Sequence, residues 1–188
     1  MARDFVVSVM ARDRVGIVAG LTEAVVELGG NIGALSQTVL EGHFTIIVTV
    51  RLEDETDMNV LIDAIRAKGA AGELQVTATE KRPGAMRPIV AGAERFVLIL
   101  TGPDQKGIIR SISSFLAGRD INIEDLYAYT EGERFMLTAE LGVPPTQELE
   151  RLLVDLEGLW PETDMRLSIQ HENIFLATNH VDFRHTLS

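Results

Sequence analysis

Two short turns in this 188-residue chain carry the side chains best suited to holding a small molecule. "DRVGI" occupies residues 13–17 and "DQKGI" occupies residues 104–108. Each turn follows a β-like apolar run and precedes a helix-like stretch, so its amides lie where unpaired N–H groups favour an anion. Asp13 and Asp104 could pair with an ammonium group. The two turns are therefore candidate sites for a zwitterion.

The same residues also have a structural explanation. An Asp at the start of a helix can cap exposed amides and complement the positive end of the helix dipole. Gly16 and Gly107 permit backbone torsions or close approaches that other residues disfavour. Asn31 and Asn122, just after the helix, could donate to and accept from a ligand, or could bond to their own backbone in a turn. Both explanations stay open here.

The chain contains an internal repeat. A shift of 91 positions aligns residues 5–50 with residues 96–141 without a gap, and nine of the aligned pairs are identical. The identical pairs include Asp13/Asp104, Gly16/Gly107, Ile17/Ile108, Asn31/Asn122 and Phe44/Phe135. Because these identities fall both at turns and at apolar core positions, they indicate duplication of one domain.

Each copy shows the same order of predicted elements. The first has strand-like runs at 5–11, 31–40, 43–52 and 73–79, with amphipathic helical stretches before the second and fourth runs. The second repeats them at 96–102, 121–130, 134–143 and 165–170. This β-α-β-β-α-β order predicts an α+β protein with two ferredoxin-like domains in tandem. Because two helices cover only one face of a four-stranded sheet, the other face is left for a partner.

Composition sets the predicted domain boundaries. The first domain is expected at residues 1–81 and the second at residues 95–170. Residues 82–94 contain two Pro and two Gly and are predicted to be a linker. Residues 171–188 form a C-terminal tail whose apolar side chains favour docking, with a disordered end or a dimer interface as alternatives.

Composition also excludes several classes of function. The chain is 46% hydrophobic and 24% charged, which is typical of globular proteins. It has no Cys, which excludes disulfides, thiolate metal sites and cysteine nucleophiles. Both halves are acidic and the net charge is -11, which argues against direct binding to DNA or RNA. No apolar run predicts a membrane span and no signal-peptide pattern is present, so a cytoplasmic location is expected.

No set of side chains predicts catalysis, a metal site or a cofactor. His180, Asp182 and His185 are close in sequence, but a metal needs convergent ligands, so a solvated end is the simpler interpretation. The hydroxyls at 111–114 have no activating group at a fixed spacing. "GGNIG" at 29–33 leads from a helix into a strand, the reverse of a phosphate-binding loop. The chain is predicted not to be an enzyme.

The repeated unit has D-x-x-G-I after its first strand and N-I opening its second, and in this it resembles an ACT domain. Two such units in a short chain resemble the glycine cleavage system transcriptional repressor family. The resemblance covers roughly residues 5–80 and 95–170. It implies a regulatory protein whose effector is an amino acid, with glycine and serine as candidates, bound near the first turn and commonly at an interface between ACT units.

The resemblance also implies particular site residues. Carried over by motif, they are Asp13, Arg14, Val15, Gly16, Ile17 and Asn31 in the first copy, and Asp104, Gln105, Lys106, Gly107, Ile108 and Asn122 in the second. The copies differ where polarity matters, because Gln105 replaces Arg14 and Lys106 replaces Val15. One site can therefore be competent while the other is structural.

The partners implied are a second copy of the chain, as a homodimer, and a protein such as a transcription factor or an enzyme. Through such a partner the chain would regulate amino-acid metabolism or transcription, which agrees with its acidity. An accessory subunit of a metabolic enzyme is one alternative, since similar segments precede the catalytic domains of formyltetrahydrofolate deformylases and some phosphoserine phosphatases. A purely structural dimerisation module is another.

Overall fold

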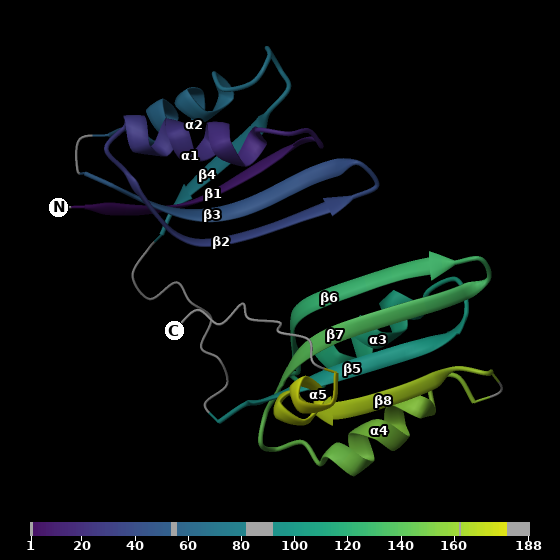
Figure 1. Cartoon of the computed structure of the whole chain (residues 1–188). Helices are drawn as coiled ribbons and strands as arrows, with labels where there is room; N and C mark the ends of the chain where they lie inside the picture. The colour runs from purple at the N-terminus through teal and green to yellow at the C-terminus, as the bar shows by residue number, and fades with distance from the viewer. Residues whose placement is uncertain (1, 54–55, 82–91, 162, 180–188) are drawn as a thin grey trace. The chain divides into compact units, whose positions relative to one another are not determined.

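The computed structural model describes residues 2–53, 56–81, 92–161 and 163–179 (Figure 1). They form two compact units, each with its own hydrophobic core. Most of the predicted linker lies outside the described residues, as do His180, Asp182 and His185 of the tail. Each unit is therefore considered by itself.

The first unit is a four-stranded antiparallel sheet with two helices on one face. Its elements are β1 (Arg3–Arg12), α1 (Ile17–Glu27), β2 (Asn31–Leu40), β3 (His43–Leu52), α2 (Met58–Arg66) and β4 (Gln75–Glu80). The strands lie in the order β2-β3-β1-β4. Alternate residues of β1, beginning with Phe5, Val7 and Val9, are buried, and Figure 1 shows both helices on one side of the sheet.

The second unit repeats this architecture. Its elements are β5 (Glu94–Pro103), α3 (Ile108–Ala117), β6 (Asn122–Glu131), β7 (Arg134–Val143), α4 (Leu149–Glu157) and β8 (Arg166–His171). The strand order is β6-β7-β5-β8, which is the first unit's order shifted along the chain. The prediction of two ferredoxin-like α+β domains in tandem is confirmed.

Corresponding residues build the two cores. Ile17, Leu21 and Val25 of α1 recur every fourth position and are buried against the first sheet. Ile108, Ile112 and Leu116 do the same on α3. Full burial of such a side chain stabilises a fold by about 1.5–3 kcal/mol, so these stripes hold both helices, and the turns that precede them, on their sheets.

An additional helix, α5 (Glu172–Asn179), follows β8. It contacts β5 and β8, and Phe175 is 8% exposed. Val97 points to the sheet face opposite its neighbours Phe96 and Leu98, yet it is only 4% exposed. Figure 1 shows α5 on the other side of the sheet from α3. The described start of the tail therefore docks on the open face of its own unit.

The second helix of each unit begins differently. Asp57 caps α2, because its carboxylate accepts a hydrogen bond of 2.7 Å from the Asn59 amide, as the sequence predicts. In the second unit, Pro144, Pro145 and Thr146 predict the start of the corresponding helix, because proline is common in a first helical turn. This prediction is wrong, because α4 begins at Leu149 after Glu148. Among the helices of the described residues, none is long and apolar enough to cross a membrane.

Candidate ligand-binding site

The two candidate turns have the same backbone geometry. Gly16 precedes α1 with φ 96°, and Gly107 precedes α3 with φ 92°. Both values lie in the left-handed region, which glycine adopts without the steric cost that a Cβ brings. The two glycines are therefore required where the chain turns from a strand into a helix.

The capping role considered for Asp13 and Asp104 is wrong. The N-cap positions are Gly16 and Gly107, and no side chain in the described part of the chain caps α1 or α3. The backbone amide of Asp13 instead donates to the Gly42 carbonyl at 2.9 Å, and the amide of Asp104 donates to the Glu133 carbonyl at 2.9 Å. Each turn is thus held against a β-hairpin, and the first amides of each helix have no side-chain acceptor.

The arginine of the first turn bonds to groups of its own domain, although the turn itself is exposed and Val15 is 97% exposed. The Arg14 guanidinium forms an ion pair with the Glu73 carboxylate. A second nitrogen of Arg14 donates to the Val15 carbonyl at 3.2 Å and lies 3.8 Å from where a Cβ on Gly16 would be. The hydrogen bond with Glu73 raises the pKa of Arg14, and the same bond lowers the pKa of Glu73. Arg14 is therefore engaged within the chain.

The second turn is open. Within the described ranges, Lys106 and Gln105 have no ion-pair or hydrogen-bond partner, and both are exposed. No described atom beyond the chain neighbours lies within 4 Å of where a Cβ on Gly107 would be. One carboxylate oxygen of Asp104 accepts a hydrogen bond of 3.5 Å from the Thr130 hydroxyl. This turn therefore carries, on neighbouring residues, an ammonium group and a carboxylate, followed by helix amides that no described side chain caps.

Sequence reasoning missed Glu73 and Thr130. The repeat aligns Glu73 with Asp164, which is exposed and makes no ion pair in the part of the chain that the structure describes. The alignment shows the difference in side-chain length but does not show that Glu73 reaches Arg14 from 59 positions away. With the shorter Asp164, the second turn has no ion pair like that of Arg14 and Glu73 among the described residues.

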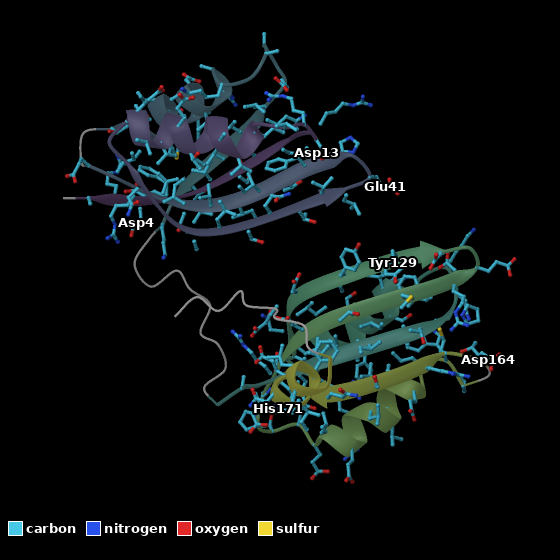
Figure 2. The ribbon with its side chains drawn as sticks, in the orientation of Figure 1. Asp4, Asp13, Glu41, Tyr129, Asp164 and His171 are labelled. Carbon is cyan, nitrogen blue, oxygen red and sulfur yellow. The ribbon has the colours of Figure 1, made fainter. Side chains whose placement is uncertain are left out.

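The structure does not bring Asn31 to the first turn. Asn31 pairs with Arg51, and the Arg51 guanidinium donates to Asp4 at 2.7 Å near the start of β1. Figure 2 shows Asp4 and Asp13 at opposite ends of β1. At about 3.3 Å per strand residue, the nine residues from Asp4 to Asp13 place the two sites roughly 30 Å apart. Asn122 lies at the corresponding distant end of the second sheet, paired with Gly142.

Asn31 instead lines a hollow of about 220 Å³, together with Asp4, Gly33, Thr49, Arg51 and Lys81. In the second unit, Glu124 aligns with Gly33 of this hollow. Its carboxylate lies 3.2 Å from the Arg95 guanidinium, and an oxygen of it lies 3.0 Å from where a Cβ on Gly142 would be. The two asparagines therefore have different surroundings despite their aligned positions.

The described residues contain no group of three or more His, Asp or Glu that could hold a metal ion. The arrangement at the second turn is instead suited to binding without a metal. A carboxylate can contact Lys106 and the first amides of α3, while an amine can contact Asp104. What the turn can do chemically is hold a small zwitterion.

Known proteins share this sequence pattern and fold. The family model described as ACT domain matches residues 3–79 and 94–170. A UPF0237 protein of Streptococcus pneumoniae is 38% identical over 64 residues, which are 34% of this chain and 73% of that protein. The crystal structure of an unknown protein from Galdieria sulphuraria has a TM-score of 0.74 and 24% identity, covering 91% of this chain and 99% of that one.

A second solved structure also spans both units. It is that of a candidate glycine cleavage system transcriptional repressor, with a TM-score of 0.65 and 18% identity, covering 90% of this chain and 97% of that one. At these identities the two structures show a shared tandem fold.

Proposed function

Since the chain belongs to the ACT domain family, with one domain in each half, we propose that it is a regulatory protein that binds a small amino acid at the turn of its second domain. The observation that carries this proposal is the contrast between the turns. Arg14 is held by Glu73 over the first turn, whereas Lys106 at the second has no partner among the residues described.

The chemistry of the second turn is complementary to an amino acid. The ligand carboxylate contacts the Lys106 ammonium group and the first amides of α3, which the positive end of the helix dipole supports. The ligand amine contacts the Asp104 carboxylate. Hydrogen bonds to charged groups contribute about 1.5–3 kcal/mol each, and they must also offset the freedom that the ligand loses on binding, so a modest affinity is expected. Glycine and serine come first because of the chain's resemblance to the glycine cleavage system transcriptional repressor family.

The proposed role of Asn31 and Asn122 needs a second ACT unit beside the turn, from the same chain or from a second copy. Each asparagine lies at the far end of its own sheet, so a ligand at the turn of the same unit does not reach it. A homodimer can place an asparagine of one copy beside the turn of the other. A ligand that contacts both copies favours one assembly by its differential affinity for the two states.

Regulation then passes through assembly or a partner protein. The outer strands of each sheet, β2 and β4 or β6 and β8, leave backbone groups available for pairing. A transcription factor or a metabolic enzyme is the kind of partner proposed, because the net charge of -11 disfavours direct binding to nucleic acid.

Calorimetric titration of the full chain with each standard amino acid at millimolar concentration tests the proposal. At least one small amino acid should bind saturably and raise the midpoint of thermal unfolding. A structural dimerisation module predicts a stable dimer whose unfolding midpoint ignores every amino acid, and that result would refute the regulatory proposal.

A further inference from the structure

A second polar hollow lies at the opposite end of α3 from the Gly107 turn. It measures about 320 Å³ and lies between the end of α3 and the start of α4. The polar residues that line it are Arg119, Thr146, Gln147, Glu148, Arg151 and Asp155. Its residues do not overlap with the turn proposed for the effector.

The first domain shows that the fold does not require these charges. The repeat aligns Arg119, Arg151 and Asp155 with Leu28, Val60 and Ala64. Leu28 and Ala64 pack against the apolar core of the first domain, and Val60 is 48% exposed. At these three positions the second domain therefore has two arginines and an aspartate where the first has apolar side chains, although the two domains share one topology. Packing alone does not explain that change.

One of the two arginines is held in position. The Arg119 guanidinium stacks over the Phe115 ring at 3.7 Å and lies 2.8 Å from an Asp155 carboxylate oxygen. The Gln147 amide donates to the Arg119 carbonyl at 3.2 Å, which ties the loop before α4 to the end of α3. A guanidinium ordered in this way loses little conformational entropy when a ligand binds.

The other arginine is available. Arg151 is exposed on α4 and, among the residues that the structure describes, it has no ion-pair partner. Asp155 already neutralises Arg119, and Glu148 adds a further negative charge to the lining. These two carboxylates make the lining neutral overall and disfavour a dense polyanion, whereas a single carboxylate can still bind the Arg151 guanidinium, which forms no ion pair within the described residues.

We propose that this hollow binds a small molecule bearing one carboxylate, with Arg151 as its main cationic contact. The Thr146 hydroxyl and the Gln147 amide oxygen suit a ligand whose body carries hydroxyl groups. The volume exceeds that of a carboxylate alone, so a hydroxy acid fits better than a simple anion. This site is independent of the proposed effector turn.

Nuclear magnetic resonance titration of the full chain with sodium lactate, at constant ionic strength, tests the proposal. Saturable amide shifts are expected at Arg119 and at residues 146–152. Arg151→Gln should weaken lactate binding about tenfold, as loss of a charged hydrogen bond does. The matched control is Arg110→Gln, an exposed arginine of α3 outside the hollow, which should leave the affinity unchanged.

Absent or non-saturable shifts, or equal lactate affinity in Arg151→Gln and wild type, would overturn the proposal. Tighter binding of sodium phosphate than of lactate would overturn the assignment to a carboxylate. If Arg151→Gln does not fold, Arg151→Val replaces it, because Val60 fills this position in the first domain. Shifts at residues 104–108 report on the effector turn, so either site can fail without the other.

Discussion

Arg14 and Glu73 form an ion pair beside the first turn, joining residues that lie 59 positions apart in the sequence. At the second turn, Gln105 replaces Arg14 and Asp164 replaces Glu73. Gln105 carries no charge, and Asp164 takes part in no ion pair within the described ranges. The duplicated fold thus has one turn whose arginine is held in an ion pair and one whose Lys106 forms no ion pair within the described residues. If the proposed function is right, this contrast predicts that only the second domain binds the effector.

The first turn should gain binding when it is made like the second. In the double variant Arg14→Gln, Val15→Lys, the ion-paired guanidinium is removed and an ammonium group is placed where Lys106 stands in the second domain. Calorimetric titration with the amino acid that binds the wild type should show a second equivalent of ligand per chain. An unchanged stoichiometry would mean that the arginine clamp is not what closes the first turn.

Gly107→Ala should destabilise the second domain. At φ 92° an added Cβ costs about 1–2 kcal/mol, and the space around Gly107 offers no compensating contact because no other described atom lies within 4 Å of that Cβ. Urea unfolding measures the change. Gly118→Ala is the control. Gly118 has φ -66°, so alanine there should leave the free energy of unfolding unchanged or raise it slightly. Equal effects of the two substitutions would refute the strain argument.

Glu140 should make the stability of the second domain depend on pH. Burial raises its pKa, and so does repulsion from Asp125, its direct partner across the sheet, and from Glu172 and Glu124, while Arg95 opposes them. A carboxyl whose pKa is higher in the folded state binds its proton more tightly there. The free energy of unfolding therefore falls as the pH rises through the unfolded and then the folded pKa.

Glu140→Gln removes this titration. The variant should be more stable than the wild type at pH 7, and its advantage should disappear near pH 4, below the ordinary pKa of glutamate, about 4.3. Urea unfolding at both pH values measures it, with the exposed α4 residue Glu150→Gln as the control. An advantage that persists unchanged at the lower pH would contradict the assignment.

Much of the fold follows from patterns that local sequence carries. Ile17, Leu21 and Val25 repeat at helical spacing, and Phe5, Val7 and Val9 alternate as a half-buried strand does. The gapless repeat then gives the second domain from the first. These periodicities can be recognised in the sequence because each one reflects which side of a single helix or strand is buried.

The candidate site was less predictable because it depends on three-dimensional distances. Asp13 and Asn31 lie on either side of one helix in the sequence, but that helix carries the chain from one end of the sheet to the other. The position of the N-cap was also missed, since Gly16 starts the helix in place of Asp13. The charged hollow that joins Arg119 to Arg151 has no local signature at all.

The most direct test of the account is the affinity of Lys106→Gln for the amino acid that binds the wild-type chain, measured by calorimetric titration beside Arg14→Gln. Lys106→Gln should raise the Kd about tenfold or more, because a charged contact to the ligand carboxylate is lost, while Arg14→Gln should bind as the wild type does. An unchanged Kd in Lys106→Gln, or an equal loss in both variants, would contradict the claim that the second turn holds the ligand.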